Sequence, residues 1–417
     1  MSAGSGTENF LWAFAVDQGN PYVYKLNSAD LTVIASAQVF NNQPAPATGN
    51  YWYLRQDAGT KNSAAGPDGS LFVVAENQYD NKLYLARIYP DFSYQLIFLD
   101  SNTSSNRRPG LVTSDLFLWA RASVPASYLY RWRIDNPFDT IDLNTAYQHA
   151  TEFGAFAQPQ GVRHMSYLEQ YDTIIYGGVN GSGTGIRLYS IFNASYPINP
   201  STPSQISSVT TNDGGWQRGA VIPKVDQGPV HAINSSAMLF INNQYNGDIY
   251  YRLNIGSDGS LSGFNNQFQS NVYQYGGTQY LANVRSLDGS TLKQGYGMGF
   301  SYYTNGNYNI TFDSAGIAQT LWNYADYNAA VAPQNFNNGT VNSCANPINQ
   351  LFYTASHIGN GQGADIIAWE IDPISSGTPR FVARTAQLWQ NNGPYRTMGI
   401  CHSTPDTHQQ KFTPLPT

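Results

Sequence analysis

The chain has 417 residues and a formal net charge of −6 at pH 7; 14% of its residues are aromatic and only 12% are charged. This acidic balance excludes the basic face that nucleic-acid binding requires, and the lack of a long apolar run predicts no membrane insertion. Many aromatic residues, together with 38 Gly and 22 Pro, favour strands joined by turns and therefore an all-β fold.

The first predicted strands differ in pattern. The residues before Phe10 lack the charged start and apolar run of a signal peptide, so no secretion signal is predicted. From Phe10, the segment Phe-Leu-Trp-Ala-Phe-Ala-Val is continuously apolar, whereas Tyr-Val-Tyr-Lys-Leu-Asn from Tyr22 alternates. Continuous apolarity is typical of a strand covered on both faces, and alternation is typical of a strand nearer the surface.

This pair of strands recurs along the chain. Alternating strands are predicted from Tyr22, Leu83, Leu129, Arg187, Tyr250, Tyr308 and Ile367, so successive starts lie 46 to 63 residues apart. Apolar strands precede most of them, from Phe10, Leu71, Leu116, Thr173, Met238 and Leu351. In the sixth repeat either Thr291-Leu-Lys or Gly297-Met-Gly-Phe fits this position. Seven repeats of about sixty residues predict seven small sheets.

A small sheet of this kind cannot bury both faces alone, so the seven sheets are predicted to stack radially as the blades of a β-propeller. The first repeat lacks an inner strand, and residues of about 395–404 are predicted to supply it and close the ring. The predicted blades are 8–50 plus 395–404, 51–104, 105–158, 159–218, 219–278, 279–335 and 336–394, followed by a tail at 405–417.

In repeat length and strand texture, the chain resembles the superfamily of seven-bladed β-propellers, with its quinoprotein-like, YVTN-repeat and lectin members. This resemblance implies a single propeller domain over residues 1–417. No WD dipeptide or kelch double glycine recurs, so it specifies an architecture and no subfamily. The lysine-poor, Asn/Gln/Tyr/Gly-rich texture is similar to that of tailed-phage virion proteins, which implies a virion location and release by lysis of the host.

Residues suited to catalysis are sparse on the predicted inner strands. Only Glu169 and Asp226 lie near these strands, so a convergent carboxylate pair for glycosidic cleavage is not predicted. His164, His231 and His402 are assigned comparable inner-strand positions, and packing is favoured there over metal binding because no carboxylate accompanies them. We therefore predict no catalytic residue, no metal and no cofactor.

Cys344 and Cys401 are the two cysteines of the chain and lie on predicted inner strands of neighbouring blades. A disulfide across the closure of the ring and two small buried thiols are both compatible with this placement. The buried thiols are favoured, because free cysteine behaves as a small apolar residue.

One residue type recurs near the predicted starts of the inner strands. These arginines are Arg55, Arg107, Arg108, Arg163, Arg218, Arg285 and Arg396, and Trp52 and Trp216 accompany them. Guanidinium groups pair with carboxylates, and aromatic faces stack on sugar rings, so the pattern predicts a ligand or docking face at one mouth of the channel. Bracing of neighbouring blades through backbone carbonyls is the alternative for the same residues.

Together these patterns predict a non-enzymatic binding or structural propeller. Its predicted identity is a phage virion component of the tail, fibre or capsid decoration, present in several copies, with a host-surface glycan or other virion proteins as partner. A free-standing carbohydrate-binding lectin is the alternative. A propeller glycoside hydrolase or lyase ranks third, because acids are scarce on the inner strands.

Overall fold

The computed structural model is all-β, which confirms the fold class predicted from composition and pattern. It describes residues 10–17, 20–40, 52–53, 63–66, 68–77, 82–100, 111–113, 117–122, 128–133, 160–168, 173–179, 186–192, 206–210, 221–223, 237–244, 247–256, 258, 260–269, 276–285, 292–301, 307–312, 318–322, 340–346, 351–357, 364–371, 379–385 and 398–403. Among these residues, no helix has the length and apolarity needed to span a membrane.

The described strands form seven antiparallel sheets, numbered here along the chain. The first has the order β28 (Met398–His402), β1 (Phe10–Asp17), β2 (Asn20–Asn27) and β3 (Val33–Gln38). In the second, β4 (Trp52–Tyr53) and β5 (Ser63–Ala65) both pair with β6 (Leu71–Asn77), which is followed by β7 (Lys82–Ile88) and β8 (Tyr94–Asp100). The third contains β9 (Leu111–Thr113), β10 (Phe117–Ala122) and β11 (Tyr128–Arg133).

The remaining four sheets each have four described strands in chain order. The fourth contains β12 (Gln160–Leu168), β13 (Thr173–Val179), β14 (Ile186–Phe192) and β15 (Ile206–Thr210). The fifth contains β16 (Val221–Pro223), β17 (Ala237–Gln244), β18 (Gly247–Ile255) and β19 (Leu261–Gln269). The sixth contains β20 (Gly276–Arg285), β21 (Leu292–Ser301), β22 (Asn307–Phe312) and β23 (Ala318–Trp322). The seventh contains β24 (Thr340–Asn346), β25 (Leu351–His357), β26 (Ala364–Ile371) and β27 (Pro379–Arg384). In the sixth repeat, two segments, 291–293 and 297–300, were candidates for the apolar strand. β21 contains most of the first segment and all of the second.

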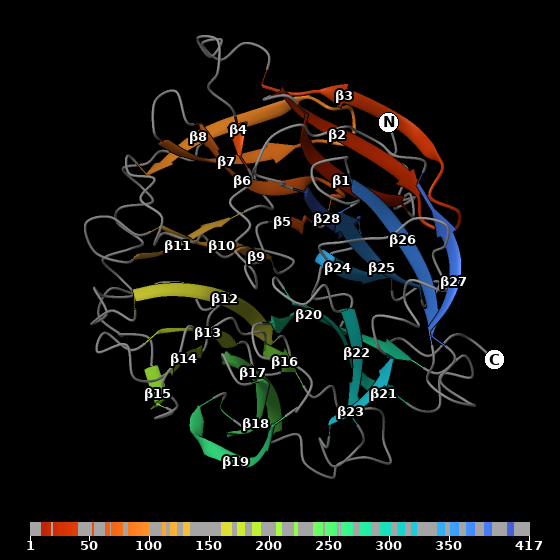
Figure 1. Ribbon diagram of the computed structural model, residues 1–417. Helices are drawn as coiled ribbons and strands as arrows, with labels where there is room; N and C mark the ends of the chain where they lie inside the picture. The colour runs from red at the N-terminus through yellow and green to blue at the C-terminus, as the bar shows by residue number, and fades with distance from the viewer. Residues whose placement is uncertain are drawn as a thin grey trace, which may run out of the picture.

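The sheets are arranged around a common centre, with β28, β5, β9, β12, β16, β20 and β24 as their innermost strands (Figure 1). Each inner strand contacts the inner strands of the neighbouring sheets. These contacts run from β28 to β5, β9, β12, β16, β20 and β24, and from β24 back to β28. The inner strands of neighbouring sheets are therefore packed against one another.

The first sheet combines segments that are far apart in the sequence. β28 pairs antiparallel with β1, so that Ile400 lies opposite Ala13 and His402 lies opposite Leu11. Two further hydrogen bonds extend this pairing: the Ser403 amide donates to the Phe10 carbonyl at 2.9 Å, and the Phe10 amide donates to Ser403 Oγ at 3.3 Å. The segment 395–404 was predicted to occupy this place.

The continuous apolarity of β1 is explained by the two interfaces that it serves. Its large side chains, Phe10, Trp12 and Phe14, form one buried cluster with small residues of the second sheet such as Ala65, Ala75 and Ala86. Its smaller side chains, Leu11, Ala13 and Ala15, form another with Leu351 and Tyr353 of the seventh sheet. Side chains of both faces of β1 thus fill the space between the first sheet and its two neighbours.

Candidate functional site

The inner strands are the part of each sheet nearest to the common centre. Each of them pairs with one neighbouring strand of its own sheet, so its other edge faces the centre. The register with the next strand shifts in three of these inner strands: between Gln160 and His164 in β12, at two points in β20, and between Thr340 and Asn342 in β24. Such irregularities re-aim side chains and are common beside active sites.

The predicted arginine face is only partly within the described residues. Arg163 lies in the irregular stretch of β12, directly before His164. Arg285 is the last residue of β20, opposite Leu292, so it ends its inner strand instead of starting it. Trp52 lies in β4 opposite Asn77. The other predicted members, Arg55, Arg107, Arg108, Arg218, Arg396 and Trp216, lie outside the described residues.

Two of the three histidines lie on described inner strands. His164 lies opposite Gly177 in β12, and His402 ends β28 opposite Leu11. His231 follows β16 by several residues and lies outside the described residues, as do Glu169 and Asp226. Over the described part of the chain, His, Cys, Asp and Glu form no group that could hold a metal ion.

Both cysteines are buried free thiols, so the favoured interpretation is confirmed and the disulfide is excluded. The reason is the placement of the two side chains. Cys344 belongs to the cluster between the seventh and first sheets, whereas Cys401 belongs to the cluster between the first and second sheets. The first sheet therefore separates the two sulfur atoms.

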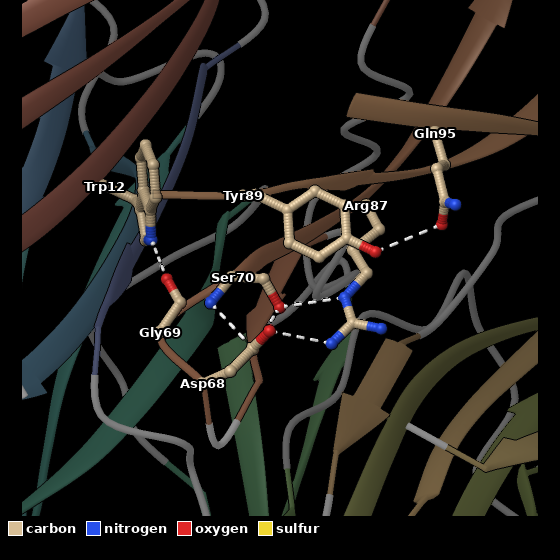
Figure 2. Close-up of polar contacts among 7 residues, drawn as sticks. All are labelled: Trp12, Asp68, Gly69, Ser70, Arg87, Tyr89 and Gln95. Carbon is tan, nitrogen blue, oxygen red and sulfur yellow. Dashed lines mark hydrogen bonds and ion pairs between the residues drawn. The ribbon is translucent and has the colours of Figure 1, made fainter. Parts of the chain in front are cut away.

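The best-defined polar cluster lies at the turn between β5 and β6 (Figure 2). Asp68 Oδ1 accepts hydrogen bonds from the Ser70 amide at 3.0 Å and from Ser70 Oγ at 2.5 Å. Asp68 Oδ2 pairs with Arg87 Nη2 at 2.8 Å, and Arg87 Nε donates to Ser70 Oγ at 3.2 Å. The guanidinium also lies 5.3 Å from the ring centroid of Phe72 and 4.8 Å from that of Tyr89, and Tyr89 Oη donates to Gln95.

This cluster holds the turn, and its geometry does not suit bond-breaking chemistry. The Ser70 hydroxyl is buried and already shared between a carboxylate and a guanidinium, so it cannot reach a substrate. The Arg87 side chain is only 4% exposed, so water contributes little to stabilising its positive charge. Asp68 and the faces of the two rings stabilise that charge instead. The Asp68 side chain, at 41% exposed, is the part that meets solvent.

The same turn chemistry occurs in three other hairpins within the described residues, and it was not predicted from the sequence. Asp30, Asp91 and Asp258 each accept hydrogen bonds from the amide and hydroxyl of Thr32, Ser93 and Ser260, two residues further on. These bonds hold the pKa of all three carboxyls below the ordinary value: the Thr32 amide contributes most at Asp30, and the serine hydroxyl contributes most at the other two. The signal in the sequence is Asp followed two residues later by Ser or Thr at a turn.

The comparisons with known proteins concern the fold. No protein-family model matches the chain, and no curated protein is a match. Among solved structures, a protein from Lactobacillus plantarum has a TM-score of 0.52 at 9% identity, over 94% of this chain and 99% of that chain. Two Bacteroides proteins are provisionally named 6-phosphogluconolactonases. The one from Bacteroides uniformis has a TM-score of 0.51 at 10% identity, over 95% of this chain and 99% of that chain. The one from Bacteroides fragilis has a TM-score of 0.52 at 10% identity, over 96% of this chain and 100% of that chain.

These likenesses show that the fold is of the β-propeller type. They also contradict the prediction of a non-enzymatic phage virion propeller, because the two Bacteroides proteins that share the fold are named as enzymes and not as virion components. A propeller hydrolase or lyase was ranked third because acids are scarce on the predicted inner strands. That criterion concerns the carboxylate pair of glycosidic cleavage and does not bear on other kinds of catalysis.

Proposed function

We propose that this protein is an enzyme that hydrolyses a lactone of an anionic sugar at the centre of a closed, seven-bladed propeller. The observation that carries the proposal is the position of Arg163 and His164, which are consecutive in an irregular stretch of an inner strand. The names of the two Bacteroides proteins of the same fold support the choice of substrate, since 6-phosphogluconolactone is a phosphorylated sugar lactone.

Closure of the ring is supported by two features of the described strands. The inner strands contact one another in an unbroken circuit, and β28 supplies the first strand of the first sheet by pairing with β1. Together with seven sheets, these features favour seven blades with the boundaries predicted from the sequence. A closed ring leaves no sheet face open at either end of the stack.

The proposed reaction needs an anion-binding group and a base. Arg163 is assigned to the phosphate or carboxylate of the substrate, because the guanidinium fork matches such oxyanions. His164 is assigned as the general base, since imidazole titrates near neutral pH. It takes a proton from water while the water oxygen attacks the lactone carbonyl carbon. The ring C–O bond then breaks, and the departing oxygen takes up a proton, so that the product is a hydroxy acid.

The test uses the release of acid. Opening a lactone at neutral pH frees one proton from the new carboxylic acid, so the purified protein is assayed at constant pH by titrant uptake with 6-phosphogluconolactone and with gluconolactone. We expect faster opening than in buffer alone, with the phosphorylated lactone preferred. Arg163→Ala is expected to raise KM for the phosphorylated lactone alone, and His164→Ala is expected to lower kcat for both by about a hundredfold.

A matched control is Arg384→Ala, which removes an arginine from β27, the outermost strand of the seventh sheet. It is expected to leave both kinetic constants unchanged. Failure of the protein to accelerate the opening of either lactone would reject the proposed reaction. Equal effects of Arg163→Ala on the two lactones would reject the role of Arg163 in binding the anion.

A further inference from the structure

Lys25 is a buried ammonium enclosed by aromatic rings. Lys25 is only 8% exposed. The Nζ atom lies 4.8 Å from the ring centroid of Phe10 and 5.6 Å from those of Trp12 and Phe92. Aromatic faces attract a cation, and the attraction is strongest where water is excluded.

The box around Lys25 is built from two sheets. Lys25 lies directly opposite Trp12 on neighbouring strands of the first sheet, and Phe10 is two residues from Trp12 on the same face. Phe92 comes from the turn between β7 and β8 of the second sheet, where its φ of 67° is in the left-handed region. The rings of Phe10 and Trp12, and of Trp12 and Phe92, meet edge to face.

The same residues are tied to the strand that completes the first sheet. Phe10 exchanges hydrogen bonds with Ser403, directly after β28, and Trp12 lies opposite Cys401 within β28. Trp12 also donates through Nε1 to the carbonyl of Gly69 in the second sheet. A path of direct contacts therefore runs from the second sheet through Lys25 and its rings to β28.

We propose that Lys25, Phe10, Trp12 and Phe92 form a lysine lock, in which the ammonium fastens the first sheet to the second and thereby keeps β28 in place. The lock is a charge-dependent joint at the point where segments 393 residues apart in the sequence meet. Loss of the positive charge releases β28 before the other inner strands. This proposal is independent of the lactone hydrolysis proposed above.

The physical reason lies in the burial of the ammonium. A lysine at this depth is kept only if favourable contacts offset its lost hydration, and the faces of three rings supply such contacts. Methionine at position 25 has nearly the same length and fills the same space but carries no charge. Lys25→Met therefore removes the attraction between charge and rings while it preserves the packing. Arginine at the same position keeps the charge and stacks on aromatic faces.

Hydrogen exchange of backbone amides in the full chain tests the lock. In Lys25→Met, amides of β28 are expected to exchange at least about tenfold faster than in the unmodified protein, while those of β17 and β18 on the far side of the ring keep their rates. In Lys25→Arg, the β28 amides are expected to remain within a few-fold of the original rate.

A second variant approaches the lock from the other sheet. Phe92→Leu removes one ring but keeps an apolar side chain. Leucine is expected to tolerate the left-handed φ at this turn, since Leu31 already adopts a φ of 62° in the corresponding turn of the first sheet. The β28 amides are again expected to exchange faster, by a smaller factor. The proposal is overturned if β28 is unaffected by both variants, or if all sheets exchange faster to the same extent.

Discussion

The indole Nε1 of Trp12 in the first sheet donates a hydrogen bond of 2.9 Å to the carbonyl oxygen of Gly69 in the second sheet (Figure 2). A bond of the same design joins the seventh sheet to the first, where Tyr353 Oη donates to the carbonyl of Ser28 at 2.5 Å. In both, a large aromatic residue on the second strand of one sheet uses its polar end to hold a turn of the next sheet. Stacked sheets are thus fixed by polar contacts as well as by apolar packing.

Trp12→Phe is expected to destabilise the protein by about 1–3 kcal/mol, because the buried carbonyl of Gly69 loses its partner. Unfolding in urea measures this free energy. Phe14→Leu serves as control, since Phe14 belongs to the same buried cluster and its ring carries no polar group. The control is expected to cost less than about 1.5 kcal/mol. A smaller cost for Trp12→Phe than for Phe14→Leu would contradict the role of the indole hydrogen bond.

Tyr353→Phe removes only the hydroxyl from a fully buried side chain and leaves the Ser28 carbonyl without this donor. We expect a loss of about 1–3 kcal/mol in the free energy of unfolding. Because Tyr353 and Trp12 belong to separate clusters on opposite faces of the first sheet, the effects are expected to add within about 0.5 kcal/mol in the double variant. Strong non-additivity would show that the two interfaces are coupled.

The strands could be predicted from the sequence because the pattern of apolar residues reflects which faces of a strand are covered. β1 is continuously apolar because both of its faces are covered. In β2, apolar and polar residues alternate because buried and partly exposed positions alternate along most of the strand. The position of β28 followed from a missing partner, because Phe10 begins a strand whose inner neighbour has to come from elsewhere. Such inferences rest on the requirements that backbone groups be hydrogen-bonded and apolar side chains be buried, which apply to every sheet.

The candidate site could be predicted less well because it depends on register and strand length. Arg285 was expected near the start of an inner strand, but β20 begins at Gly276 and carries register shifts, so Arg285 falls at its other end. The irregular stretch around Arg163 has no signature in the residues themselves. Lys25 occupies a polar position in an alternating strand and yet is buried, because the ring that covers it comes from Phe92 of another sheet.

The two glycines of the turn between β5 and β6 are required for different reasons. A Cβ at position 66 would lie 2.7 Å from Ser70 Oγ and 2.9 Å from both Asp68 Oδ1 and the Phe72 ring, so Gly66→Ala is expected to break the cluster of Figure 2 and cost about 1–3 kcal/mol. A Cβ at position 69 has space, with its nearest neighbour 3.8 Å away, but the φ of 77° is unfavourable for alanine.

Gly69→Asn therefore distinguishes space from backbone conformation, because asparagine tolerates a left-handed φ better than alanine does. We expect Gly69→Ala to cost about 1–2 kcal/mol and Gly69→Asn to cost less, as measured by urea unfolding.

Equal stability of Gly66→Ala and the unmodified protein would mean that Ser70 and Asp68 can move apart without penalty, contrary to the short contacts between them.

The hydrogen bonds from the Ser93 hydroxyl and amide to Asp91 predict a dependence of stability on pH. They lower the pKa of Asp91 in the folded protein, and the Lys25 ammonium adds to this effect. A carboxyl whose pKa is lower in the folded than in the unfolded state stabilises the fold above the unfolded pKa, which is about 4. That stabilisation is lost as the pH falls through the pKa of the folded state.

Ser93→Ala removes the hydroxyl, which has the largest effect on this carboxyl, so the pKa of Asp91 is expected to rise toward its ordinary value. Titration of the carboxyl carbon by NMR measures the change directly. At pH 6 the variant is expected to have a lower free energy of unfolding than the unmodified protein. This difference is expected to become smaller toward pH 3, because a protonated Asp91 no longer benefits from the serine donor in either protein. Ser93→Thr keeps both donors, as Thr32 does beside Asp30, and is expected to keep the low pKa. An unchanged pKa in Ser93→Ala would assign the effect to the backbone amide alone.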